Sequence, residues 1–231
     1  MRLLVQAAKS LTAIVSVIVL VTGCAASSGS PGARAVAPPK ELWVAVVGDS
    51  YTGGSDMGGV GGRGWPALAG AQLRDQGLVV TMQVNSEGGA GYAERGVNGG
   101  VFADQLAGLR AYTNVVVFLG SRNDDEEAPD VVAAAARDAY AKAKSLAPQA
   151  KLLAIGPFWP DMPVTPEALT QRDAVRDAAV AAGAVFVDPM TLHWLDQPGL
   201  IGADGVHPND AGHQYLADQI TPLLKNELVG I

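Results

Sequence analysis

From Leu42 onward, short runs of apolar residues alternate with longer stretches in which apolar residues recur at helical spacing. Runs this short and this apolar predict buried strands, and they lie at residues 42–47, 78–84, 115–119, 152–155 and 185–187. The longer stretches predict helices at residues 66–76, 102–112, 129–147, 165–182 and 210–224, the last with Pro222 as a candidate bend. Since parallel strands are joined by right-handed helical crossovers, the pattern predicts one α/β domain, with a five-stranded parallel sheet covered by helices on both faces.

The composition excludes several classes of protein. Of the 231 residues, 48% are hydrophobic and 17% are charged, which suits a globular core and not a disordered chain. The net charge is −7 and no stretch is densely basic, which argues against nucleic acid as a partner, because such binding needs Lys and Arg to neutralise phosphates. The single cysteine forms no intrachain disulfide, and three scattered histidines do not predict a metal site, so we expect no metal or cofactor. The composition leaves the oligomeric state open.

The first residues have the pattern of a signal peptide. Arg2 and Lys9 precede an apolar run at residues 11–21. At ~1.5 Å per residue, a helix of this length reaches only about half of a ~30 Å hydrocarbon core, so the run is too short to span a membrane. We therefore expect residues 1–23 to be an export signal.

The segment Val21-Thr22-Gly23-Cys24 resembles the bacterial lipobox, in which small residues precede a cysteine that is acylated. The resemblance implies lipidation at Cys24 and a location at the outer face of the cytoplasmic membrane or in the cell envelope. The alternative is an ordinary signal peptide cleaved at another bond, which would release a secreted protein and make Cys24 incidental. Residues 24–40 are rich in Ser, Gly, Ala and Pro, which predicts a flexible linker before a domain at residues 41–231.

Four polar segments follow, or lie near, the ends of predicted strands. In an open parallel sheet, ligands bind beyond the carboxyl ends of the strands, so these segments predict the functional site. They are Gly48-Asp49-Ser50-Tyr51, Asn85 with Gly88-Gly89-Ala90-Gly91, Gly120-Ser121-Arg122-Asn123-Asp124, and Asp204-Gly205-Val206-His207-Pro208.

Together these segments contain the groups that acyl transfer needs. Ser50 can attack a carbonyl carbon if a base accepts its proton, and His207 is the candidate base. Asp204 precedes His207 by three residues and can turn back to hold the imidazole by its other nitrogen. Asp188, at the end of the last predicted strand, is an alternative partner, but proximity in sequence favours Asp204.

The oxyanion formed in such a reaction needs preorganised hydrogen-bond donors. The candidates are the Ser50 amide, a glycine amide and the Asn123 carboxamide, each worth on the order of 3 kcal/mol of barrier. Glycine suits this position because it has no side chain to block the approach of the backbone to the substrate.

These segments, in this order, resemble the motif blocks of the SGNH (GDSL) hydrolase superfamily, over about residues 42–224. Trp65-Pro66-Ala67-Leu68 resembles the usual continuation of the first block, and Asp204-Gly205-Val206-His207-Pro208-Asn209 is the most specific match. The resemblance implies a flavodoxin-like, three-layer α/β/α sandwich. The site residues that it implies are Ser50 as nucleophile, His207 as base, Asp204 as its orienting partner, and Asn123 with one glycine in the oxyanion hole.

Two departures from the family pattern affect the site residues. The third block usually reads Gly-x-Asn-Asp, whereas here two residues separate Gly120 from Asn123. The second block is a residue longer than expected between Asn85 and its last glycine. We choose Gly91 as the oxyanion donor because the step from Ala90 to Gly91 best matches the family pattern, and Gly89 is its competitor.

The resemblance implies an ester hydrolase that works without metal or cofactor. Its substrate would be a small-molecule, cell-wall or lipid acyl ester, and water would release the acid after Ser50 is acylated. Two alternatives stay open: an O-acyltransferase with the same triad, and a catalytically inactive binding lipoprotein on the same fold. In each case, contact with a membrane is expected through the lipid anchor only.

The remaining candidate residues have structural interpretations. His213 is expected to pack against the sheet or face solvent on the last helix, and His193 to lie at the surface. Trp65 is expected to pack in the interior rather than to border a cleft. The proline-rich segment at residues 156–163 would either form a wall of an acyl pocket or cap the fourth strand.

Overall fold

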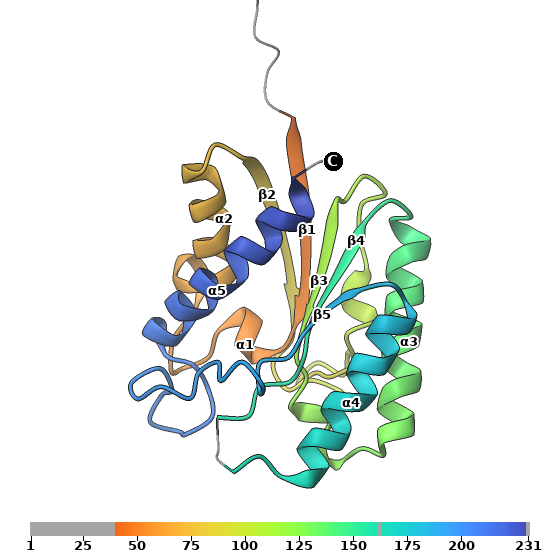
Figure 1. Cartoon of the computed structure of the whole chain (residues 1–231), viewed down its shortest axis with the longest axis vertical. Coiled ribbons are helices and arrows are strands. Elements are labelled where there is room, and N and C mark those ends of the chain that lie inside the picture. The colour runs from red at the N-terminus through yellow and green to blue at the C-terminus, as the bar shows by residue number, and fades with distance from the viewer. Residues whose placement is uncertain (1–39, 161–162, 230–231) are drawn as a thin grey trace, which may run out of the picture. The chain divides into compact units, whose positions relative to one another are not determined.

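The computed structural model describes residues 40–160 and 163–229 (Figure 1). The predicted signal peptide, the lipidation site at Cys24 and all but the last residue of the predicted linker lie outside these residues. In the part of the chain that is described, no helix is long and apolar enough to cross a membrane.

The core of the domain is a parallel sheet of five strands, as predicted. The strands are β1 (Glu41–Gly48), β2 (Val79–Ser86), β3 (Val115–Leu119), β4 (Lys151–Ile155) and β5 (Val185–Val187). Their order is β2-β1-β3-β4-β5, and every neighbouring pair is parallel. The chain therefore reverses direction across the sheet between β1 and β3, and a crevice at such a switch point is where ligands of open α/β sheets bind.

Helices cover both faces of the sheet (Figure 1). Helices α2 (Trp65–Asp75) and α5 (Asp210–Leu228) lie on one face, and α3 (Pro129–Leu146) and α4 (Pro166–Ala181) lie on the other. Successive side chains of a strand point to opposite faces, so Val44 and Val46 of β1 pack with α2 and α5, while Ala45 and Val47 pack with α3 and α4. This arrangement is the predicted three-layer α/β/α sandwich.

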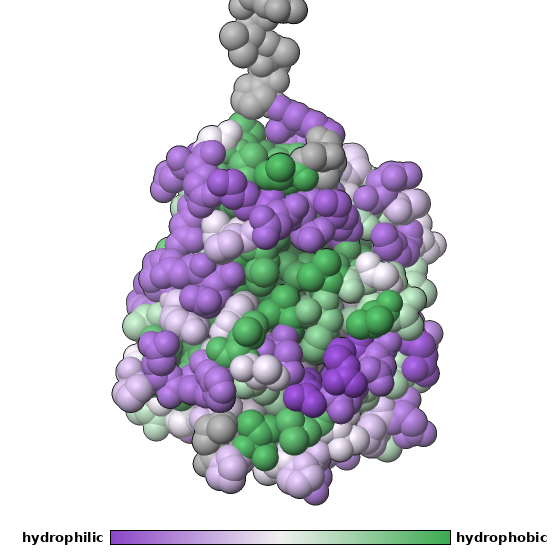
Figure 2. Space-filling model, viewed as in Figure 1, coloured by the Kyte–Doolittle hydropathy of each residue, from purple (hydrophilic) through white to green (hydrophobic). Residues whose placement is uncertain are grey.

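Strand β5 ends the sheet and leaves some of its apolar surface uncovered, with Val185 44% exposed. Figure 2 shows hydrophobic residues gathered along the middle of this view of the molecule, between mainly hydrophilic flanks. The long segment after β5 leads back to the carboxyl ends of the other strands before α5 begins (Figure 1).

The prediction of a helix at residues 102–112 is wrong. This segment contains only a single 3₁₀ turn at Asp104–Leu106, and Gly108 adopts φ +80°, a left-handed conformation that ends helical geometry. Phe102 and Leu106 are buried, so apolar residues at helical spacing here pack an irregular loop against the sheet. The last helix, in contrast, continues through Pro222 to Leu228, beyond the predicted end.

Candidate active site

Ser50 lies directly beyond the carboxyl end of β1, on the one-turn helix α1 (Ser50–Gly53). The Asp49 side chain caps this helix by accepting a hydrogen bond from the Tyr51 amide at 2.8 Å. Gly48 must be glycine, because a Cβ there would lie 2.2 Å from the Thr52 hydroxyl oxygen. The serine therefore lies on a tight turn between strand and helix, in which position 48 has no room for a side chain.

Asp204 and His207 lie together in the segment that follows β5. One oxygen of the Asp204 carboxylate accepts from the amides of Val206 and His207, at 2.9 and 3.0 Å, and the other lies 2.6 Å from His207 Nδ1. The hydrogen bond with His207 and those amides lower the pKa of Asp204 to about 2, so this carboxyl is ionised at neutral pH. An ionised carboxylate can only accept, which places the proton of His207 on Nδ1 and leaves Nε2 as an acceptor.

The second ring nitrogen of His207 contacts the serine hydroxyl. His207 Nε2 lies 3.0 Å from Ser50 Oγ, although the two residues are 157 positions apart in sequence. The alternative partner, Asp188, is engaged elsewhere, by Arg172 at 3.2 Å and the Thr191 hydroxyl at 2.7 Å. The fold thus brings together the three side chains that the sequence singled out, with Asp204 beside the histidine.

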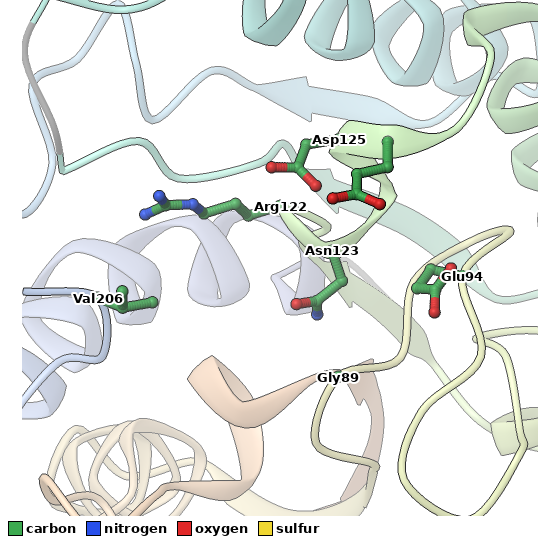
Figure 3. A pocket seen from close by; sticks show the side chains of 7 residues that line it. Gly89, Glu94, Arg122, Asn123, Asp125 and Val206 are labelled. Carbon is green, nitrogen blue, oxygen red and sulfur yellow. The ribbon is translucent and has the colours of Figure 1, made fainter. Parts of the chain in front are cut away.

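Asn123 lies at the edge of a cavity of about 380 Å³ beside this group. Its Nδ2 donates to the Ala90 carbonyl at 2.8 Å and makes a longer contact, 3.2 Å, with Asp49 Oδ2. Figure 3 shows its carboxamide pointing toward the loop that carries Gly89. The other lining residues are Gly89, Glu94, Arg122, Asp125, Glu126 and Val206.

Gly91, the predicted oxyanion donor, lies in the loop after β2. Its amide donates to the Glu94 carbonyl at 2.9 Å, so this donor already has an acceptor within the loop. Gly91 is glycine for another reason, since a Cβ there would lie 2.3 Å from Asp124 Oδ1. Gly89, the predicted competitor, lines the cavity with Asn123 and has φ +76°, and this position favours it as the donor.

Asp124 is a positioning residue that the sequence did not single out. The acidic run that it begins is typical of a solvated turn, yet its side chain is completely buried. Its carboxylate accepts from the amides of Tyr92, Ala93 and Glu94, at 2.8 to 2.9 Å. It therefore ties the loop after β2 to the segment after β3, and its place in the third motif block was the available signal.

Asp49 is the second buried carboxyl of the site, only 2% exposed. Loss of hydration raises its pKa to about 7, and its amide hydrogen bonds oppose that rise only in part. Because it contacts both the Tyr51 amide and Asn123 Nδ2, this carboxyl links the nucleophile turn to the segment after β3.

The remaining candidates behave as structural residues. Trp65 and His213 are fully buried, and His193 is exposed beside Asp196, at 2.8 Å. The segment after β4 places Phe158 against the Tyr51 ring, with centroids 5.3 Å apart, and Trp159 beneath Arg122. It therefore packs directly over the nucleophile turn, whereas residues 161–162 of this segment lie outside the described residues.

Known proteins are similar to this chain in sequence and in fold. Over 192 residues, the chain is 50% identical to the GDSL lipase Rv0518 of Mycobacterium tuberculosis, covering 81% of this chain and 83% of that one. The structure is similar to that of TesA, at 25% identity and a TM-score of 0.67, covering 81% of this chain and 100% of that one. It also resembles the esterase EstA of Pseudoalteromonas sp. in fold, at 14% identity and a TM-score of 0.66, covering 80% and 98%.

The family assignment rests on the sequence match. Residues 46–215, which contain all four motif segments, match the GDSL-like lipase/acylhydrolase family. The chain belongs to this GDSL-like lipase/acylhydrolase family, and it is a hydrolase that acts on ester bonds.

Proposed function

We propose that this hydrolase cleaves acyl esters by a two-step serine mechanism, with Ser50 as nucleophile, His207 as base and Asp204 as its orienting partner. The observation that carries the proposal is the continuous chain of contacts from Ser50 Oγ to His207 Nε2, at 3.0 Å, and from His207 Nδ1 to Asp204, at 2.6 Å. A nucleophile, a base and a group that fixes the base's tautomer are the parts of such a triad.

In the first step, Ser50 Oγ attacks the ester carbonyl carbon and passes its proton to His207 Nε2. The carbonyl oxygen becomes an oxyanion, and the proposed donors to it are the amides of Ser50 and Gly89 and the Nδ2 of Asn123. The contact of Asn123 with Asp49 is the longer of its two, at 3.2 Å, so it is the one that an oxyanion would replace. Collapse of the intermediate expels the alcohol, which takes its proton from His207.

In the second step, water attacks the acyl-Ser50 ester and gives a proton to His207. The second intermediate collapses to release the acid, and the proton returns to Ser50 Oγ. Asp204 stays ionised throughout, because its pKa of about 2 lies far below neutral pH, and it stabilises the imidazolium formed in each step.

The proposed substrates are acyl esters of the cell envelope, such as carbohydrate O-acetyl groups or lipid esters. Polar and charged side chains line most of the cavity beside Asn123, which favours a substrate with polar groups near the ester. The proposed location follows from the N-terminal sequence: export by residues 1–23 and retention at the membrane by a lipid on Cys24.

The test is hydrolysis of chromogenic short-chain and long-chain acyl esters by the parent protein and by Ser50→Ala. The substitution is expected to lower kcat about a thousandfold or more, because the nucleophile is lost. The matched control is Ser145→Ala, on the exposed surface of α3, which should leave kcat unchanged. Ester cleavage that survives in Ser50→Ala would remove this serine from its proposed role.

Product analysis with and without an added acceptor alcohol separates hydrolysis from acyl transfer. Free acid as the main product in both cases supports the hydrolase. A new ester that accumulates with the acceptor would instead identify the O-acyltransferase alternative, which shares the first step. A folded parent protein that is inert toward every ester would favour the binding-protein alternative.

A further inference from the structure

The Tyr51 side chain links the nucleophile turn to the segment that carries the base. Tyr51 is only 4% exposed, and its hydroxyl donates a hydrogen bond to the backbone carbonyl of Val206. Tyr51 follows Ser50 in sequence, and Val206 precedes His207. One side chain therefore fixes the distance between two backbone positions, each next to a reacting side chain.

A charged residue of the segment after β3 also acts on Tyr51. The positive charge of Arg122, the residue before Asn123, opposes the rise in the pKa of Tyr51 that burial causes. Burial raises the pKa of Tyr51, so the phenol stays protonated and its hydroxyl donates a hydrogen bond to the Val206 carbonyl. Tyr51 and Val206, each next to a proposed catalytic residue, are thus joined by one hydrogen bond, with the charge of Arg122 nearby.

The ring is held so that the hydroxyl has a defined position. It stacks on Phe158, with centroids 5.3 Å apart and an angle of 22° between the planes. Phe158 in turn contacts Trp194, at 6.3 Å, which lies in the same long segment as His207. Two neighbouring parts of the chain therefore prevent the Tyr51 ring from turning away.

The segment of His207 is braced mostly within itself, which makes its connection to Ser50 important. The His207 carbonyl accepts from the Gly202 amide at 2.8 Å, and the Asn209 amide donates to the Leu200 carbonyl at 2.9 Å. These bonds shape the loop but do not tie it to the nucleophile turn. The bond from Tyr51 to Val206 does so next to the reacting pair, and the bond from the Gly59 amide to Asp210, at 2.9 Å, holds the end of the segment where α5 begins.

We propose that the Tyr51 hydroxyl is the positioning group that holds the segments of Ser50 and His207 at the distance that catalysis needs. The inference rests on the proposed function. Tyr51 stands where the GDSL name of the family has leucine, and Arg122 lies in the lengthened third block.

The test measures activation of Ser50 with an uncharged 4-nitrophenyl phosphonate ester, in Tyr51→Phe and in the parent. Ser50 Oγ forms a bond to phosphorus, 4-nitrophenolate leaves with the electron pair of its P–O bond, and His207 takes the serine proton. Phenylalanine keeps the stacked ring and removes only the hydroxyl. The maximal rate of labelling is expected to fall about 10- to 100-fold, the loss typical of a slight misplacement, while the half-saturating reagent concentration stays nearly constant.

The control is Tyr112→Phe, which removes a phenol that is 55% exposed and packs beside Trp43, near the start of β1. It should label at the parent rate. Labelling of Tyr51→Phe at the parent rate would overturn the positioning role and leave the nucleophile assignment intact. Absence of labelling in the folded parent would overturn the proposed function and this inference together.

A second variant tests the influence of the Arg122 charge and guards against misfolding of Tyr51→Phe. Arg122→Gln should also slow labelling, and the double variant should be within about threefold of Tyr51→Phe alone, because the charge acts on the Tyr51 hydroxyl. Fully independent effects, or an Arg122→Gln protein that labels at the parent rate, would show that Arg122 does not act through Tyr51. Thermal unfolding of each protein confirms that folded molecules are compared.

Discussion

The two halves of the site are held in opposite ways. Ser50 follows a central strand, above a glycine with no room for a side chain, and Asp49 beneath it is 2% exposed. Asp204 and His207 lie in a long segment after the three-residue edge strand β5, with side chains 34% and 29% exposed. The nucleophile is thus built into the core, whereas the base is brought to it by a surface segment.

Because of this difference, substitutions in the two halves should affect different properties, the stability of the fold in one and turnover in the other. A change in the tightly packed turns near Ser50 should cost free energy of unfolding, because neighbouring groups cannot move aside. A change in the exposed segment of His207 should cost turnover and leave the free energy of unfolding nearly intact. The predictions below test this contrast from the largest effect to the smallest.

The largest effect is expected on the exposed side, from Asp204→Asn. The amide cannot hold His207 with its Nδ1 protonated, so the base loses its tautomer, and kcat should fall on the order of 10³- to 10⁴-fold. Because the segment is solvated, the unfolding midpoint should shift by less than about 3 °C. Steady-state kinetics and thermal unfolding check the two expectations. A protein that unfolds early but keeps its kcat would break the contrast.

On the packed side, Gly91→Ala and Gly89→Ala should separate stability from activity. The new methyl at Gly91 would lie 2.3 Å from the buried Asp124 carboxylate, and such overpacking costs about 2–3 kcal/mol of unfolding free energy. A Cβ at Gly89 would make only an ordinary contact, 3.8 Å from the Gly96 Cα, so its substitution should cost only about 1–2 kcal/mol, from its φ of +76°.

The two glycine variants also locate the oxyanion donor. Gly89→Ala should lower kcat about tenfold or more, because its amide would shift from the oxyanion, while folded Gly91→Ala should keep more of its activity. Urea unfolding and kinetics at a temperature where both proteins are folded provide the comparison. The reverse pattern would restore Gly91 as the donor.

The smallest effect is on the pH dependence of stability. Burial lowers the pKa of His213 to about 4 from 6.5, so the unfolded chain binds a proton between these values and the folded protein does not. Stability should therefore fall as the pH decreases from about 6.5 to 4. Asp49 acts in the opposite sense: its pKa rises from 3.8 to about 7, so its contribution weakens stability as the pH increases from about 4 to 7.

Two variants separate these contributions. His213→Gln should flatten the acidic side of a plot of unfolding free energy against pH, and Asp49→Asn should flatten the decline toward neutral pH, each by on the order of 2 kcal/mol. Urea unfolding between pH 4 and 8 measures both slopes. If both variants have the slopes of the parent, burial does not change the pKa of His213 or of Asp49 on folding.

Local patterns predicted the strands well because a buried parallel strand needs an unbroken apolar run, which is visible in residues 115–119. The same reasoning gave a wrong helix at residues 102–112. Apolar residues recur there at helical spacing, but the segment is a loop in which Gly108 has a positive φ. The triad candidates were identifiable because each follows or lies near a strand end. Gly91 was chosen from the motif alone. The sequence around it does not reveal that the Asp124 carboxylate lies where a Gly91 side chain would be.

Contacts between segments that are distant in sequence could not be predicted from local sequence patterns. Tyr51 was noted only as part of a motif, and its bond to Val206 joins residues 155 positions apart. Asp124 was part of an acidic run, and its burial depends on three amides of another loop. Both roles arise from the packing of loops around the switch point, which no single segment encodes.

The most direct test of the account is the site of acylation itself. A chromogenic acyl ester is mixed with the protein, the reaction is quenched with acid, and the acyl group is located by peptide mapping with mass spectrometry. One acyl group per molecule is expected, on Ser50, with the yield sharply reduced in His207→Ala. An acyl group on any other residue, or turnover of the ester with no covalent intermediate and with Ser50→Ala as active as the parent, would contradict it.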